Sequence, residues 1–257
     1  MQRTNYLHLY MIFIVALIWL KDTTASSLIL ATDDGPPHMI KATNSGIDIE
    51  IVRQVLNQIG YDIDTVYVSL KRAKRMVIEN KADVFVPTFF QDDSDKIYLS
   101  HPVIRYRPMV FMLKSRNISY HAISDLKHLS IATFQGASGY FGEEFSSLSK
   151  KSDYRELPDM AKLPELLLKG RFDVIILDFY IFYYFLKKQL ENNPAPFAYS
   201  EISSFALVPE VNAYAGFNNK TLRDKFNQQL SIFKGDKLDQ EIIEYYIGPI
   251  EILADED

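Results

Sequence analysis

Val77-Ile-Glu-Asn-Lys-Ala-Asp-Val-Phe-Val-Pro-Thr88 and Leu167-Leu-Lys-Gly-Arg-Phe-Asp-Val-Ile-Ile-Leu-Asp178 decide the fold, because both stretches follow one pattern. Each reads as the end of a helix, a residue that tolerates left-handed backbone (Asn80 or Gly170), an aspartate and a short apolar run. Apolar runs of this length are too short for helices and are typical of strands covered on both faces. A helix that leads into a buried strand, present twice, predicts two α/β lobes with a ligand-binding cleft between them.

The residues before the first repeat favour a mostly parallel sheet. An apolar run at 28–31 ends in a polar, proline-rich loop, and Gly46 precedes an amphipathic helix that Gly60 ends. A strand at 61–68 and a helix at 70–79 follow. This order is typical of parallel strands joined by right-handed crossovers. We expect the apolar segment 110–113 to lead out of the first lobe.

The N-terminus has the layout of a secretory signal. Arg3 precedes an apolar run at 7–20, and the small residues Thr23-Thr24-Ala25 follow. A membrane span needs about 20 apolar residues, so this run is short for one. We expect residues 1–25 to be a cleaved signal peptide; an uncleaved anchor is the alternative.

Composition excludes several classes of protein. The net charge of −5 argues against a nucleic-acid-binding protein, which normally has a basic face. The chain has no cysteine, which excludes disulfides, thiol catalysis and cysteine-based zinc sites. Nucleophile-elbow spacing and paired metal-binding histidines are also missing from the sequence. We therefore expect no catalytic residues, metal or cofactor.

The order of several motifs resembles the family 3 extracytoplasmic solute-binding proteins, the polar amino-acid receptors of ABC importers. The resemblance covers essentially the whole chain after residue 25. The matching motifs are Ala31-Thr-Asp33, Gly46-Ile-Asp-Ile-Glu, Leu70-Lys-Arg-Ala73, Lys81-Ala-Asp-Val, Leu99-Ser-His-Pro102, Asp125-Leu-Lys127, Gln135-Gly136 and Gly170-Arg-Phe-Asp-Val.

The resemblance implies an α/β, two-lobed periplasmic-binding-protein fold of type II, in which each lobe is a mostly parallel sheet flanked by helices. Residues 26–112 and 212–257 would form lobe 1, and residues 113–211 lobe 2. A small-molecule ligand would bind between the lobes and close them about a hinge. The resemblance also implies a periplasmic monomer that delivers its ligand to an ABC permease or reports to a membrane receptor.

The resemblance indicates three polar residues that face the ligand, of which Asp178 and Thr88 would lie at its ammonium group. Asp33 follows the first strand, and its alternative role is a loop turn. Asp178 ends a buried strand, and its alternative role is to cap the next helix. Thr88 matches a position where a hydroxyl or carbonyl meets the ammonium; a surface threonine is the alternative.

A ligand carboxylate would need donors, which the loop 135–138 is expected to provide. The backbone N–H groups at Gly136 and Ser138, helped by a helix expected at 141–148, are suited to an anionic group. In the resembling family an arginine at position 93 would clamp that carboxylate, but this chain has Asp93. Arg72 is our candidate replacement, although its basic cluster is also typical of a solvated helix face.

The loop at 89–95, which contains Asp93, also favours a different ligand. Phe90 and its neighbours combine aromatic rings with the acids Asp92, Asp93 and Asp95. An acidic, aromatic cleft is suited to a cationic solute through ion pairing and cation–π contact; solvated loop acids are the alternative.

Two other functions remain open: an enzyme on the same scaffold, dehydratase-like, and a ligand sensor that acts through a membrane partner.

Overall fold

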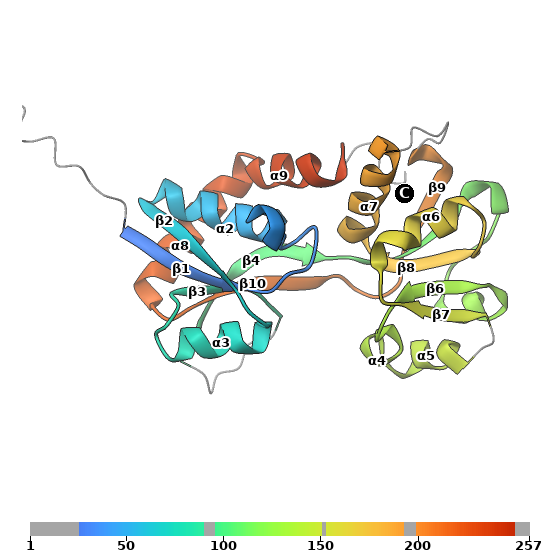
Figure 1. Cartoon of the computed structure of the whole chain (residues 1–257), viewed down its shortest axis with the longest axis horizontal. Helices are drawn as coiled ribbons and strands as arrows, with labels where there is room; N and C mark the ends of the chain where they lie inside the picture. The colour runs from blue at the N-terminus through green and yellow to red at the C-terminus, as the bar shows by residue number, and fades with distance from the viewer. Residues whose placement is uncertain (1–25, 90–95, 151–152, 193–198, 250–257) are drawn as a thin grey trace, which may run out of the picture.

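The computed structural model describes residues 26–89, 96–150, 153–192 and 199–249, which form two five-stranded sheets (Figure 1). The first sheet has the order β2-β1-β3-β10-β4 and the second β7-β6-β8-β5-β9. The first sheet contains β1 (Ser26–Thr32), β2 (Tyr61–Tyr67), β3 (Val84–Thr88), β4 (Tyr98–Tyr106) and β10 (Val211–Phe217). The second contains β5 (Pro108–Leu113), β6 (Ile131–Phe134), β7 (Tyr154–Leu157), β8 (Val174–Asp178) and β9 (Ile202–Ala206).

Helices cover both faces of each sheet. The helices of the first lobe are α2 (Ile47–Gln58), α3 (Leu70–Ile78), α8 (Lys220–Gly235) and α9 (Leu238–Ile247). Those of the second lobe are α4 (Ala137–Tyr140), α5 (Gly142–Ser146), α6 (Leu163–Leu168) and α7 (Phe179–Asn192). Short 3-10 turns occur at η1 (Lys41–Thr43), η2 (Lys114–Arg116), η3 (Ile123–His128), η4 (Leu148–Lys150), η5 (Met160–Lys162) and η6 (Tyr199–Glu201).

Strand directions repeat between the two sheets. β1 is parallel to β2 and β3, while β10 is antiparallel to β3 and β4, so four of the five strands run the same way. β6 is parallel to β7 and β8, and β5 is antiparallel to β8 and β9, which gives the same arrangement again. The expected α/β fold with two mostly parallel sheets is therefore confirmed.

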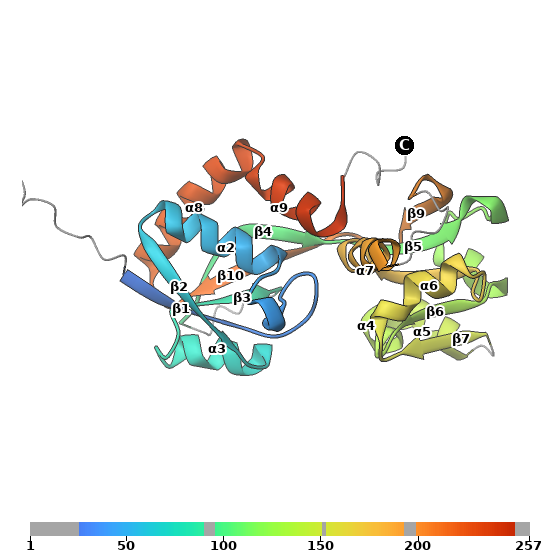
Figure 2. The same cartoon turned by 45° about the horizontal axis from the view of Figure 1, so that its top comes forward.

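The hydrophobic core continues from one lobe into the other. α2, α8 and α9 cover one face of the first sheet and α3 the other (Figure 2). α7 of the second lobe packs into the same apolar cluster as α9, and the rings of Tyr184 and Tyr246 lie 6.5 Å apart across the boundary. The two lobes thus share apolar packing on this side of the molecule.

The repeated motif that predicts the fold has one structure in both lobes. Asn80 and Gly170 have φ angles of 55° and 61°, as expected for left-handed ends of helices. The two buried strands that follow, β3 and β8, occupy the middle of their sheets. The repeat is thus structural as well as sequential.

The aspartate of each repeat joins its strand to the neighbouring strand. Asp83 Oδ2 accepts a hydrogen bond of 2.8 Å from the backbone N–H of Ile29. Asp173 Oδ2 accepts one of 3.0 Å from the N–H of Ser130. Each carboxylate therefore fixes the position at which a parallel strand pair begins.

We expect Asp83→Ala and Asp173→Ala each to lower the free energy of unfolding by about 1–2 kcal/mol, because a strand N–H loses its acceptor. Urea denaturation followed by circular dichroism measures the loss. Asp62→Ala, which removes an exposed acid from β2, is the matched control and should change stability by less than about 0.5 kcal/mol. Equal losses in all three variants would contradict the structural role of the repeated aspartates.

The expected boundary between the lobes at residue 112 differs from the observed strand pairing. β5 pairs with β8 and β9, so the whole of it belongs to the second sheet. Only Arg107 separates it from β4, and no turn signal marks the crossing. The chain returns between β9 and β10, close to the expected boundary after residue 211.

The described part of the chain contains no helix with the length and apolar character that a membrane crossing requires. The predicted signal peptide, residues 1–25, lies outside the described residues.

Candidate functional site

A buried histidine of the first lobe meets a carboxylate of the second. His38 lies in the loop after β1, and its side chain is 2 % exposed. Its Nδ1 is 2.8 Å from Oδ1 of Asp48 on α2, and its Nε2 is 3.5 Å from Oδ1 of Asp178 at the end of β8. One buried side chain therefore connects α2 of the first lobe to the end of β8 in the second.

Aromatic rings enclose this histidine. The His38 ring stacks on Tyr106, with centroids 4.0 Å apart and planes 16° from parallel, and meets the edge of Tyr180 at 5.7 Å. The Tyr106 hydroxyl donates a 3.1 Å hydrogen bond to Oδ2 of Asp48. Phe89, just after β3, meets the Tyr106 ring edge-on at 5.0 Å. The cluster combines residues of both lobes with Tyr106, at the end of β4 where the chain first crosses between them.

The neighbouring carboxylates keep His38 charged. Burial by itself would lower the pKa of His38, but the charges and hydrogen bonds of Asp48 and Asp178 raise that pKa to about 9. Burial, followed by the charge of Asp48, raises the pKa of Tyr106 well above its ordinary value. At neutral pH the site therefore contains an imidazolium and a phenol that donates a hydrogen bond to Asp48.

Asp178 makes the helix-capping contacts that were the alternative to its ligand role. Its Oδ1 accepts hydrogen bonds from the N–H groups of Tyr180 at 2.9 Å and Ile181 at 3.3 Å, at the start of α7. Its Oδ2 accepts a 2.7 Å hydrogen bond from the N–H of Arg107, between β4 and β5. The predicted contact with a ligand ammonium remains a prediction.

The backbone N–H groups expected to hold a ligand anion are bonded to a side chain of the protein. Glu156 Oε2 accepts from the N–H of Gly136 at 2.8 Å, and Oε1 accepts from the N–H of Ser138 at 2.9 Å. The Tyr154 hydroxyl donates a further 2.8 Å hydrogen bond to Oε1. These donors, the Gly136 N–H first, lower the pKa of Glu156 to about 2 despite some desolvation. A carboxylate is therefore held here by the protein itself.

The helix expected at 141–148 is also different from the one observed. Phe141 separates α4 from α5, and α5 begins at Gly142 with a φ of 83°, so only a four-residue helix follows Gly136. A helix this short has little dipole to offer an anion. The prediction that the dipole of a helix at 141–148 helps the loop 135–138 to bind an anion is therefore wrong.

The remaining predicted residues lie on the first lobe. Asp33 is half-buried; its Oδ1 accepts from the N–H of Asp34 at 2.9 Å and its Oδ2 from the N–H of Leu70 at 3.3 Å, at the start of α3. Thr88 is half-buried at the end of β3, and Arg72 is exposed on the first turn of α3. Phe90 and Asp93 lie outside the described residues.

Sequence reasoning missed His38 and Asp48 as a pair, although one signal was present. Asp48 falls three, four and seven residues before Ile51, Val52 and Val55, all fully buried on α2. An acid on the apolar face of an amphipathic helix needs a buried partner. That partner, His38, lies only ten residues before Asp48. The second contact of His38 was hidden, because Asp178 lies 140 residues away in sequence.

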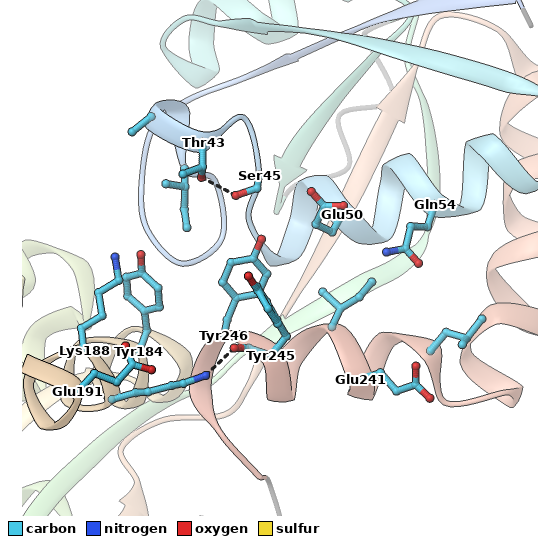
Figure 3. Close-up of a pocket in the computed structure, with 15 residues that line it drawn as sticks. Thr43, Ser45, Glu50, Gln54, Tyr184, Lys188, Glu191, Glu241, Tyr245 and Tyr246 are labelled. Carbon is cyan, nitrogen blue, oxygen red and sulfur yellow. Dashed lines mark hydrogen bonds between the residues drawn. The ribbon is translucent and has the colours of Figure 1, made fainter.

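A separate groove of about 910 Å³ lies on another side of the lobe junction (Figure 3). It is lined by the loop at 40–45, by α2 and α9 of the first lobe and by α7 of the second. Lys187 Nζ donates a 2.6 Å hydrogen bond to the carbonyl of Tyr245 across it. α7 and α9, which line this groove, lie above the connecting strands in Figure 1, whereas α3 and α4 lie below them. The residues predicted to bind a ligand do not line it.

The described residues contain no group of three or more histidine and acidic side chains arranged to hold a metal ion. The His38 cluster therefore pairs charges and hydrogen bonds without metal-ligand geometry.

Comparison with known proteins gives one family match and many similar folds. A model of the bacterial extracellular solute-binding proteins, family 3, matches residues 28–249. An ancestral cationic amino acid solute-binding protein is 17 % identical with a TM-score of 0.70, and the match covers 88 % of this chain and 97 % of that one. The L-cystine solute receptor of Neisseria gonorrhoeae, in its unliganded open conformation, is 16 % identical with a TM-score of 0.66 and coverages of 91 % and 97 %.

A histidine kinase sensor domain is also similar in fold, at 15 % identity and a TM-score of 0.56, with coverages of 86 % and 96 %. The search of curated proteins found no match. At these identities the structural likenesses establish the fold alone.

Proposed function

The chain belongs to the bacterial extracellular solute-binding proteins of family 3, and from this premise we propose that it captures a small cationic solute, an amino acid or a related amine, between its two lobes. The solute is bound and released unchanged. Lobe 1 comprises the first sheet with α2, α3, α8 and α9, and lobe 2 the second sheet with its helices. The lobes close on the solute by rotation about the two crossings between the sheets.

One observation carries the choice of a cationic solute. Glu156 already accepts hydrogen bonds from the N–H groups of Gly136 and Ser138, the donors best placed for a ligand anion. A cationic solute is also favoured by the net charge of −5 and by Asp93, which stands where the clamping arginine would be. The similar ancestral protein named for cationic amino acids agrees with this choice.

The proposed binding groups lie at the strand ends of lobe 1. Asp33 has a carboxylate beside the start of α3, and Thr88 is the last residue of β3, with Phe89 next to it. A carboxylate and an aromatic face recognise an ammonium or guanidinium group by ion pairing and cation–π contact.

Isothermal calorimetry tests the proposal with arginine, lysine, putrescine and spermidine against glutamate and glutamine. We expect binding heat for at least one cation and none for glutamate, with no new product by mass spectrometry. Asp33→Asn should weaken cation binding roughly 10- to 100-fold, since hydrogen bonds to charged groups contribute about 1.5–3 kcal/mol. Asp62→Asn, on the exposed side of β2, is the charge-matched control.

Two results would overturn the proposal. Glutamate binding as tight as that of any cation would exclude the cationic preference. Turnover of a bound solute would instead favour the enzyme on this scaffold.

We propose an ABC permease as the partner that receives the solute. The similar histidine kinase sensor domain favours a second candidate, a ligand sensor that reports to a membrane receptor. Solute uptake by cells that lack this protein separates the two, because a transport receptor is needed for uptake and a sensor only for the response to the solute.

A further inference from the structure

We propose that Glu156 and His38 occupy, from within the protein, the two positions where the head group of a free α-amino acid would be held, so that this receptor selects amines that lack an α-carboxylate. This inference rests on the proposed function, whose solute class it narrows. An α-amino acid carries an ammonium group, which needs an acceptor, and a carboxylate, which needs donors. The candidate acceptor is Asp178, and the candidate donors are the N–H groups of Gly136 and Ser138.

The donor side is filled by a carboxylate. The two oxygens of Glu156 each accept one of these N–H groups, at 2.8 Å and 2.9 Å, in the two-point geometry that a ligand carboxylate would adopt. The Tyr154 hydroxyl fixes Oε1 at 2.8 Å from the other side. A ligand carboxylate would have to displace Glu156, which exchanges one carboxylate for another without a gain in hydrogen bonds.

The acceptor side is filled by a cation. Asp178 Oδ1 accepts from the N–H groups of Tyr180 and Ile181 and faces Nε2 of His38, and Oδ2 accepts from the N–H of Arg107. An ammonium group would therefore have to share this carboxylate with the imidazolium 3.5 Å away, and two positive charges on one carboxylate repel each other.

His38 is held firmly in that position. Asp48 binds Nδ1 at 2.8 Å, the Tyr106 ring stacks on the imidazole at 4.0 Å, and the side chain is only 2 % exposed. Moving it would leave the Asp48 carboxylate buried without its cation. Together, an internal carboxylate and an internal imidazolium reproduce the charges of an amino-acid head group.

Paired ligands that differ only in the α-carboxylate test this directly. Calorimetry compares arginine with agmatine and lysine with cadaverine. We expect the wild-type protein to bind the decarboxylated member at least tenfold more tightly. Glu156→Ala frees the N–H groups of Gly136 and Ser138, and we expect this variant to bind arginine at least tenfold more tightly than wild type does. Glu165→Ala removes an exposed acid from α6 and is the matched control, with no change expected.

A second variant tests the cation side. His38→Gln combined with Asp48→Asn replaces the buried pair by neutral side chains of similar size and frees Asp178 from its cation. We expect this variant, once its folding is verified by thermal unfolding, to gain affinity for the α-ammonium group of arginine. If it does not fold, Glu156→Ala alone decides.

The inference and the proposed function fail in different ways. Equal affinity of the wild-type protein for arginine and agmatine would overturn the inference and leave a cationic solute in place. So would the absence of any gain in arginine binding by Glu156→Ala. Arginine binding by Glu156→Ala, in a protein whose wild type binds none of the cations, would support the inference and overturn the proposed function.

Discussion

Asp48→Ala is expected to lower the free energy of unfolding by about 3–5 kcal/mol, the loss typical of a buried ion pair that loses one partner. Asp48 is fully buried and is the nearest carboxylate to the His38 imidazolium, at 2.8 Å. The substitution leaves that cation with only the 3.5 Å contact to Asp178 and removes the acceptor of the Tyr106 hydroxyl. Both losses fall in a region that water does not reach.

Urea denaturation of the full chain measures this loss. Glu50→Ala is the matched control, because Glu50 is also an acid in the first turn of α2 but forms a partly exposed pair with Arg53. We expect it to change stability by about 1 kcal/mol or less. Similar losses in the two variants would show that the His38 pair contributes no more than a surface ion pair.

The pH dependence of stability gives a second check on the same pair. The folded-state pKa of His38 is about 9, above its ordinary value of 6.5, so protonation favours the folded state. The contribution, about 3 kcal/mol by linkage, is fully present below pH 6.5 and is lost as the pH rises through 9. Wild-type stability should therefore fall more than that of His38→Gln between pH 6.5 and 9.5. Parallel profiles would contradict a charged His38.

Gly46→Ala is expected to lower the free energy of unfolding by roughly 3–5 kcal/mol, through backbone strain combined with overlap. Gly46 has a φ of 130°, which a residue with a side chain rarely adopts. A Cβ atom there would lie 2.4 Å from the carbonyl oxygen of His38 and 2.9 Å from Cα of Met39. Both neighbours are backbone atoms, so no side-chain rotation relieves the overlap.

Gly60→Ala separates the two causes, because Gly60 ends the same helix that Gly46 precedes. Its φ of 89° also disfavours alanine, but a Cβ there would meet nothing within 4 Å. We expect a loss of about 1–2 kcal/mol from conformation alone. If thermal and urea unfolding give equal losses for Gly46→Ala and Gly60→Ala, then contact with the His38 loop is not the reason for glycine at position 46.

The elements that could be predicted from sequence carry strong local signals. The helix at 47–58 has apolar residues at helical spacing and a glycine at each end, and the two repeated strands follow left-handed stops and an aspartate. By contrast, β4 contains His101, Pro102 and Arg105, which blur its alternation. Such residues are tolerated because β4 is an edge strand. β7 is also an edge strand, of only four residues. Neither β4 nor β7 was predicted from the sequence.

The candidate site was less predictable because its contacts are distant in sequence. Glu156 reaches the N–H of Gly136 only because β7 pairs with β6, with Thr133 opposite Glu156. Because β7 was not predicted, the sequence did not indicate that Glu156 lies near the loop 135–138. Asp178 was identified from its position at the end of a strand, but its bonds to α7 and to His38 depend on how the lobes meet.

The two links between the lobes differ in length. Between β4 and β5 there is a single residue, Arg107, whose N–H is anchored on Asp178, and Pro108 restricts the backbone on both sides of the following peptide. The return link between β9 and β10 is longer, at residues 207–210. In the proposed closure, two adjacent links, one of them a single residue long, would restrict the lobes to rotation about one axis. Solutes of different size would stop this rotation at different angles, so the extent of lobe closure would depend on how well the solute fits between the lobes.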